Sequence, residues 1–155
     1  MMDLVEELAQ IVSRLREGKV EFALCGGLAM AVYAFPRATL DIDIMIQPAA
    51  LRRAKQVASE LGFSHDSGLM RFQKGAIQIH RLCKIAQESG ETLVLDLVLA
   101  TPQMKEVWKS RRKVRWDRGI MPVVSPEGLI RMKSMRNSGQ DRDDIEHLRK
   151  LSRED

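Results

Sequence analysis

Residues 39–44 read Thr-Leu-Asp-Ile-Asp-Ile, and this alternation predicts a β-strand over residues 40–46. In an extended strand, residues i and i+2 point to the same face, so Asp41 and Asp43 share one face and the aliphatic residues share the other. With a rise of about 3.3 Å per residue, the two aspartates lie roughly 6 to 7 Å apart along the backbone. Such like charges favour a bound cation, and Mg²⁺ prefers oxygen ligands. The alternative is a solvated pair at a sheet edge or near a turn.

A third carboxylate interrupts the most apolar segment of the chain. Asp96 lies in the middle of residues 93–99, which otherwise predict a strand inside a sheet. An unpaired carboxylate there would be costly, so Asp96 needs a partner. If this strand lies beside residues 40–46, three carboxylates converge on one face, as in sites that bind two metal ions for nucleotidyl transfer. The alternative is an ion pair of Asp96 with Arg81 or Arg37.

Two glycines, Gly26 and Gly27, separate a predicted strand over residues 21–25 from the apolar residues 28–33, which predict a buried helix. Glycine allows the backbone to approach a phosphate closely, and the amide groups of a helix N-terminus point toward an anion. A plain structural turn accounts for the same dipeptide.

Helical periodicity and turn residues divide the remaining chain into further elements. The predicted elements are a helix capped by Asp3 and ended by Gly18, a helix opened by Pro48 and ended by Gly62, a hairpin over residues 69–82 with its turn at Lys74-Gly75, helices behind Thr101-Pro102 and Ser125-Pro126, and a final helix with Ile145, Leu148 and Leu151. Strands interleaved with helices indicate an α/β (mixed α+β) sheet domain with a helical C-terminal end. We expect one domain over residues 1–155, with its core over about 20–124 and C-terminal helices over about 125–151.

Composition restricts the function classes. The chain has 155 residues, of which 45% are hydrophobic and 30% charged, as expected of one globular domain. A net charge of +4 is compatible with a phosphate-bearing partner but is too small for a dedicated nucleic-acid binder. Cys25 and Cys83 lie in apolar surroundings and predict reduced core thiols. An acidic N-terminus and the absence of an apolar run of about 20 residues predict a cytoplasmic protein without a membrane partner.

Residues 108–118 mix six basic residues with two tryptophans. This composition suits a phosphate backbone and base stacking, so it offers a site for an RNA acceptor. A solvated edge strand is the alternative. The three histidines show no metal-ligand spacing.

The order of glycines, helix and aspartates resembles the signature of the DNA polymerase β-like nucleotidyltransferase superfamily, in particular its small AbiEii-like, minimal nucleotidyltransferase branch. That branch has a Gly-Gly or Gly-Ser turn, a helix, a strand with the pattern Arg-x-Ser/Thr-x-Asp-hydrophobic-Asp, and a third acid on a later strand. The counterparts here are Gly26-Gly27, Arg37-Ala38-Thr39-Leu40-Asp41-Ile42-Asp43 and Asp96. Residues 125–133 and 140–145 look like the family's C-terminal helices, so the resemblance covers roughly residues 20–150.

The resemblance implies a twisted mixed sheet flanked by helices and a metal-dependent nucleotidyl transfer. It implies Mg²⁺, with two ions possible and Mn²⁺ able to substitute, and a nucleoside triphosphate such as ATP. The implied catalytic residues and metal ligands are Asp41, Asp43 and Asp96, and the implied nucleotide-binding residues are Gly26, Gly27, Arg37, Thr39 and Lys133. Lys133 lies on the inner face of its helix, where it either contacts phosphate or extends from the core edge into solvent. Arg37 and Thr39 suit a structural role beside the acids equally well.

One position departs from the family pattern, because Gln140 stands where relatives commonly have lysine. Asp141 and Asp144 are expected to cap helices or form ion pairs. The implied enzyme moves a nucleoside monophosphate to a hydroxyl group of RNA, protein or a small molecule, in a toxin-antitoxin or phage-defence system with a cognate toxin or antitoxin chain. The alternative is a non-catalytic binding module with the same fold, antitoxin-like or a scaffold.

Overall fold

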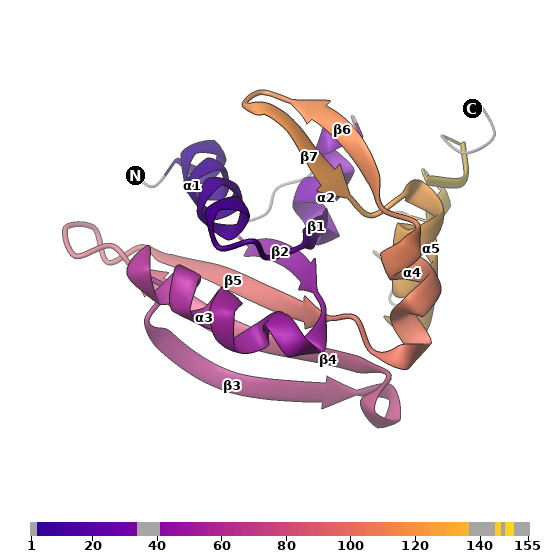
Figure 1. Ribbon diagram of the computed structural model, residues 1–155, viewed down its shortest axis with the longest axis horizontal. Helices are drawn as coiled ribbons and strands as arrows, with labels where there is room; N and C mark the ends of the chain where they lie inside the picture. The colour runs from indigo at the N-terminus through magenta and orange to yellow at the C-terminus, as the bar shows by residue number, and fades with distance from the viewer. Residues whose placement is uncertain (1–2, 34–40, 137–144, 147, 151–155) are drawn as a thin grey trace.

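The computed structural model describes residues 3–33, 41–136, 145, 146 and 148–150, and a seven-stranded mixed sheet runs through it (Figure 1). The strands lie in the order β3-β4-β5-β2-β1-β7-β6. Their bounds are β1 (Phe22–Cys25), β2 (Asp41–Ile46), β3 (His65–Phe72), β4 (Ile77–Ile85), β5 (Thr92–Leu99), β6 (Arg112–Trp116) and β7 (Gly119–Val123). Strand β2 pairs in parallel with β5 and antiparallel with β1, so it lies in the middle of the sheet.

The helices of the described residues pack on both faces of this sheet. They are α1 (Leu4–Glu17), α2 (Gly26–Val32), α3 (Leu51–Glu60), α4 (Lys105–Lys109) and α5 (Pro126–Arg136), with 3-10 turns η1 (Pro48–Ala50), η2 (Gln73–Gly75) and η3 (Pro102–Met104). The predicted α/β class, with a mixed sheet and flanking helices, is therefore confirmed.

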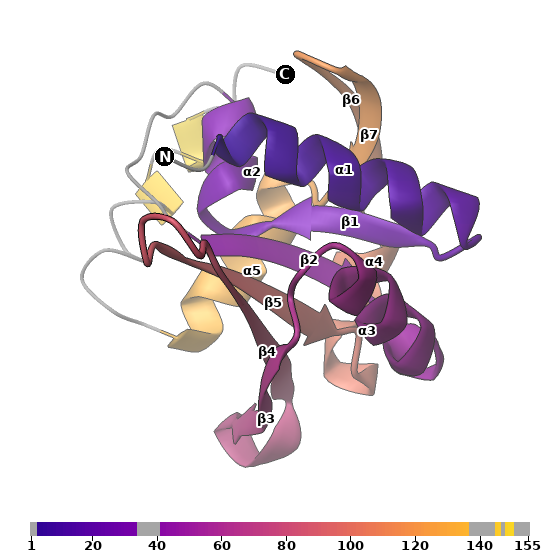
Figure 2. The same cartoon turned by 90° about the vertical axis from the view of Figure 1, so that its left-hand side faces the viewer.

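Figure 2 shows α1 and α3 on one side of the central strands and α5 on the other. On the first face, Lys84 of β4 donates to Glu7 of α1 at 2.9 Å, and Lys55 of α3 pairs with Asp66 of β3 at 2.8 Å. On the second face, α5 contributes Lys133 to a pocket that also contains Asp43. The aspartate face of β2 is thus the face that α5 covers.

Burial along β2 follows the predicted alternation over residues 41–44, after which Met45 and Ile46 are both buried. Ile42 and Ile44 are fully buried under α1 and α3, whereas Asp41 and Asp43 are half-buried on the opposite face. Sheets with antiparallel pairs commonly pack one face on the core and carry polar side chains on the other, which is the pattern of residues 41–44. None of the helices in the described part of the chain has the length and apolarity of a membrane span.

Helix caps appear where the sequence predicts them in two cases. The Asp3 carboxylate accepts from the Val5 and Glu6 amides at 3.0 and 3.3 Å, and the Ser125 hydroxyl accepts from the Gly128 amide at 3.0 Å. Thr101 lies at the N-cap position of η3, directly before Pro102, as the sequence predicts, but its buried hydroxyl donates to the Ala76 carbonyl at 2.7 Å and makes no capping hydrogen bond. This bond ties the end of β5 to the turn before β4.

The hairpin over residues 69–82 is longer than predicted, since β3 begins at His65 and β4 continues to Ile85. Edge strand β3 is exposed at its polar beginning, so the pattern of buried residues that reveals a strand is missing there. In the predicted last helix, Ile145 and Leu148 are helical and buried, whereas Leu151 lies outside the described residues.

We expect Ile44→Ala to lower the free energy of unfolding by about 2 to 5 kcal/mol, because it leaves a cavity in the middle of the sheet. Urea unfolding followed by circular dichroism measures this change. Ile120→Ala, at a side chain that is 46% exposed, is the control and should change stability by less than about 1 kcal/mol. Equal losses in the two variants would contradict the burial described here.

Candidate functional site

The ladder between β2 and β5 brings the predicted carboxylates together. The register places Asp43 beside Asp96 and Asp41 beside Val94. Neighbouring strands lie about 4.8 Å apart, so the side chains of Asp43 and Asp96 emerge next to each other on one face. Asp96 is almost completely buried, whereas the other two aspartates are half-buried. Strands β2 and β5 are therefore neighbours, which is the condition under which the three aspartates were predicted to converge.

The turn between β1 and α2 packs directly on Asp43. Gly26 has a φ of +68°, a conformation that L residues with side chains rarely adopt. A Cβ atom on Gly26 would lie 2.6 Å from Cγ of Asp43, which is closer than any van der Waals contact. Cys25, the preceding residue, is the register partner of Asp43 in the β1–β2 ladder. Glycine at position 26 is thus required both by its backbone conformation and by the close approach of Asp43.

Arg81 of β4 is the partner of the buried carboxylate of Asp96. Its Nε and Nη2 groups each donate to one oxygen of Asp96 at 2.9 Å. Such a bidentate pair has the geometry of the strongest protein ion pairs. This bond and the charges of Asp96 and Asp41 raise the pKa of Arg81 above its usual value, although partial burial acts in the opposite direction. The sequence offered Arg81 and Arg37 as partners of Asp96. The structure shows that Arg81 binds Asp96, whereas Arg37 lies outside the described residues.

Lys133 of α5 lies against the same face and is 4% exposed. With Cys25, Gly26 and Asp43 it forms the polar side of a small pocket between α5 and the sheet. The remaining lining is apolar and consists of Ile77, Ile79, Val98, Met104, Leu129 and Met132. The predicted position of Lys133 on the inner face is therefore correct. Its contact with a phosphate stays a prediction.

The pKa of Cys25 is affected by the charged side chains of this site. Its thiol is fully buried, and its pKa is raised well above the usual value, first by burial and then by the negative charges of Asp43 and Asp96. The positive charge of Lys133 has the opposite, smaller effect. Cys25 is thus a free, buried thiol that stays protonated at neutral pH, in agreement with the predicted core thiol, whereas Cys83 is only half-buried.

The oxygen donors of this site can be compared with the needs of Mg²⁺. Within the described part of the chain, no group of three or more His, Cys, Asp or Glu side chains is arranged to hold a metal ion. Asp41 and Asp43 supply two carboxylates on one face, and Mg²⁺ is commonly held by one or two carboxylates plus substrate phosphates and water. The pair fits this requirement, whereas Asp96 directs both oxygens to Arg81. Metal binding by all three aspartates stays a prediction.

Of the remaining candidate residues, the structure describes only Gly27. Gly27 is in the first turn of α2. Arg37 and Thr39 lie outside the described residues, as do Gln140, Asp141 and Asp144. Their predicted roles therefore stay predictions.

The basic segment over residues 108–118 divides between α4 and the hairpin of β6 and β7. Trp108 is 7% exposed, and the Arg111 guanidinium lies 3.7 Å from its ring centroid, so this indole is not available for stacking on a base. Strand β6 forms the edge of the sheet, and its exposed basic side chains Arg112, Lys113 and Arg115 are typical of a protected edge. The edge-strand interpretation of this segment fits the structure better than an RNA stacking site.

We predict that Gly26→Ala lowers nucleotide binding and stability together, because the new methyl group displaces the Asp43 carboxylate and strains the positive φ. Calorimetric titration with Mg²⁺ and ATP, combined with thermal unfolding, measures both effects. Gly90→Ala, at another positive φ but with nothing within 4 Å of the added atom, controls for backbone strain. If Gly26→Ala bound the nucleotide as tightly as the wild type does, the close contact between Gly26 and Asp43 would not be needed for binding.

Comparison with solved structures identifies the fold. No protein-family model and no curated protein matches the sequence. A proposed nucleotidyltransferase from Thermotoga maritima aligns with a TM-score of 0.63 at 21% identity, over 97% of this chain and 93% of that chain. The lincomycin-bound lincosamide antibiotic adenylyltransferase LnuA aligns with a TM-score of 0.61 at 17% identity, over 93% of this chain and 95% of that chain.

The antibiotic-resistance factor ANT(2'')-Ia, in complex with adenylyl-2''-tobramycin, aligns with a TM-score of 0.63 at 13% identity, over 96% of this chain and 88% of that chain. At these identities the likeness concerns the fold alone, and the AbiEii-like branch stays a prediction. The chain has the nucleotidyltransferase fold that the glycine turn and the aspartate strand predicted.

Proposed function

We propose that this protein is a metal-dependent nucleotidyltransferase that moves an adenylyl group from ATP to a hydroxyl group of a small molecule. The observation that carries the proposal is the pair Asp41 and Asp43 on a central strand, beside Asp96 and packed under the glycine turn at Gly26, in this fold. The adenylyltransferases LnuA and ANT(2'')-Ia share the fold and are bound to lincomycin and to adenylyl-2''-tobramycin, respectively. They support an adenylyl donor and a small-molecule acceptor here.

In the proposed reaction, the acceptor oxygen forms a bond to the α-phosphorus while the bond from that phosphorus to the β-phosphate oxygen breaks and pyrophosphate leaves. Mg²⁺, when held by Asp41 and Asp43, would neutralise charge on the triphosphate. We assign the backbone at Gly26 and Gly27 to close contact with the phosphates, and the ammonium group of Lys133 to charge stabilisation. Asp96 is the carboxylate to which we assign the proton of the attacking hydroxyl.

RNA or protein acceptors, and a place in a toxin-antitoxin or phage-defence system with a partner chain, are further proposals that follow from the sequence resemblance. The non-catalytic module has one observation in its favour, which is that both oxygens of Asp96 are bound to Arg81. Calorimetry with Mg²⁺ and ATP separates the two functions, because a non-catalytic module without a nucleotide site would show no heat at millimolar nucleotide.

The test of activity uses each of the four nucleoside triphosphates labelled at the α-phosphate, with Mg²⁺ and hydroxylated small molecules or a cell extract. We expect label transfer from ATP, and a loss of at least about a hundredfold in Asp41→Asn and in Asp43→Asn, since removal of one electrostatic group from an active site commonly costs this much. Both changes keep the size of the side chain.

Asp117→Asn is the matched control, because it makes the same chemical change at an exposed position between β6 and β7. Its rate should equal that of the wild type. Absence of transfer to every acceptor, or equal transfer by Asp43→Asn, would argue against the proposed enzyme.

A further inference from the structure

The ion pair between Arg81 and Asp96 occupies the third carboxylate of the proposed site. Both Asp96 oxygens accept from the guanidinium group at 2.9 Å, and the Asp96 side chain is only 5% exposed. Water therefore has little access to this carboxylate, and Arg81 provides its charge compensation among the described residues. A metal ion that binds Asp96 would have to take at least one oxygen from Arg81.

Arg81 has room to move, unlike its partner. Its side chain is 39% exposed. Its register partner on edge strand β3 is Gly68, which follows an irregularity in the pairing between Asp66 and Gly68. A Cβ atom on Gly68 would meet nothing within 4 Å, so the structure is open at this point of the sheet edge. Irregularities of this kind are frequent next to active sites, where they alter the direction of side chains.

The charge of Arg81 acts on more than one carboxylate. Asp96 and Asp41 both raise the pKa of Arg81, so the guanidinium lies in the field of these two carboxylates. A positive charge in this position opposes a free divalent cation and favours a nucleotide, because Mg²⁺ carries a charge of +2 whereas Mg·ATP is a net anion. The same side chain thus has opposite effects on the two ligands.

We propose that Arg81 holds Asp96 while the site is without ligand and exchanges this carboxylate for phosphate oxygens when Mg·ATP binds. The inference rests on the proposed function. On binding, the guanidinium releases at least one oxygen of Asp96. Its N–H groups then donate to the triphosphate. Arg81 in this way prevents tight binding of metal alone and couples metal binding to nucleotide binding.

The test compares the affinity for Mn²⁺ alone with the affinity for ATP in the presence of Mg²⁺, in wild type and in Arg81→Met. Mn²⁺ binding is followed by the paramagnetic signal of the free ion, and ATP binding by calorimetry. We expect Arg81→Met to bind Mn²⁺ roughly tenfold more tightly and ATP roughly tenfold more weakly, as removal of one partly screened charge predicts. A merely structural role would weaken both or neither.

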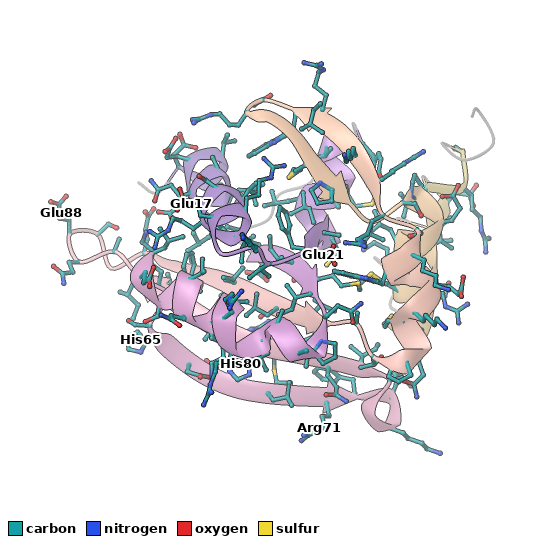
Figure 3. All side chains as sticks on the ribbon, viewed as in Figure 1. Glu17, Glu21, His65, Arg71, His80 and Glu88 are labelled. Carbon is teal, nitrogen blue, oxygen red and sulfur yellow. The ribbon has the colours of Figure 1, made fainter. Side chains whose placement is uncertain are left out.

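Two further variants define the cause. Arg81→Lys keeps the charge but loses the bidentate fork, so it should bind ATP nearly as the wild type does and bind Mn²⁺ with an affinity between those of wild type and Arg81→Met. It also preserves the test if Arg81→Met does not fold. Arg71→Met is the control, because it removes a charge from the neighbouring strand β3 on the opposite face of the sheet from Arg81. The register partner of Arg71 on β4 is Gln78. The Arg71 side chain extends outward from the strand (Figure 3). Both affinities of Arg71→Met should equal those of the wild type.

The inference is wrong if Arg81→Met binds Mn²⁺ no more tightly than wild type, or if both affinities fall together. The proposed function survives either result when the wild-type protein still transfers label from ATP. Absence of Mn²⁺ and ATP binding in wild type and in every variant would instead overturn the proposed function together with this inference.

Discussion

A carboxylate buried within a sheet has to be compensated, and Asp96 of β5 imposes this condition on the surrounding structure. The compensation comes from β4, whose register places Arg81 beside Asp96 so that the planar guanidinium meets both oxygens. On the other side of β5, the β2 ladder places Asp43 next to the same carboxylate. The pairing of β4, β5 and β2 therefore organises charges as well as backbone hydrogen bonds. A different register would leave a buried charge without its partner.

The second constraint is the approach of the β1–α2 turn to Asp43. This contact needs glycine at position 26, and it brings the backbone of the turn against one of the two proposed metal ligands. From the C-terminal part of the chain, α5 adds the nearly buried Lys133 on the same face. The site is consequently assembled from segments that are distant in sequence, and the rigid central strands keep them in position. Such support from regular elements holds functional groups more accurately than loops do.

The fold does not decide the acceptor. Proteins with this fold include one bound to lincomycin and one bound to adenylyl-2''-tobramycin, and each shares less than a fifth of its aligned residues with this chain. Function depends on the groups around the site more than on the architecture. In this chain the pocket next to Asp43 and Lys133 is mainly apolar, and the basic segment with two tryptophans is divided between the end of α4, where Trp108 is buried, and a sheet edge. These features favour a compact acceptor over a stacked nucleic acid.

The sequence by itself determined the alternation of β2, the glycine turn, the carboxylates and the class of fold, because strand periodicity and turn chemistry are local properties of the chain. Even the need of Asp96 for a partner followed from its apolar neighbours. Only the tertiary structure decided which of the two arginines that partner is, since Arg81 meets Asp96 through the pairing of β4 with β5, whose register depends on the geometry of the loop between these strands. The hydroxyl of Thr101 and the packing of Trp108 were decided in the same way, because burial against distant segments overrides the local preference of a cap or a surface aromatic group.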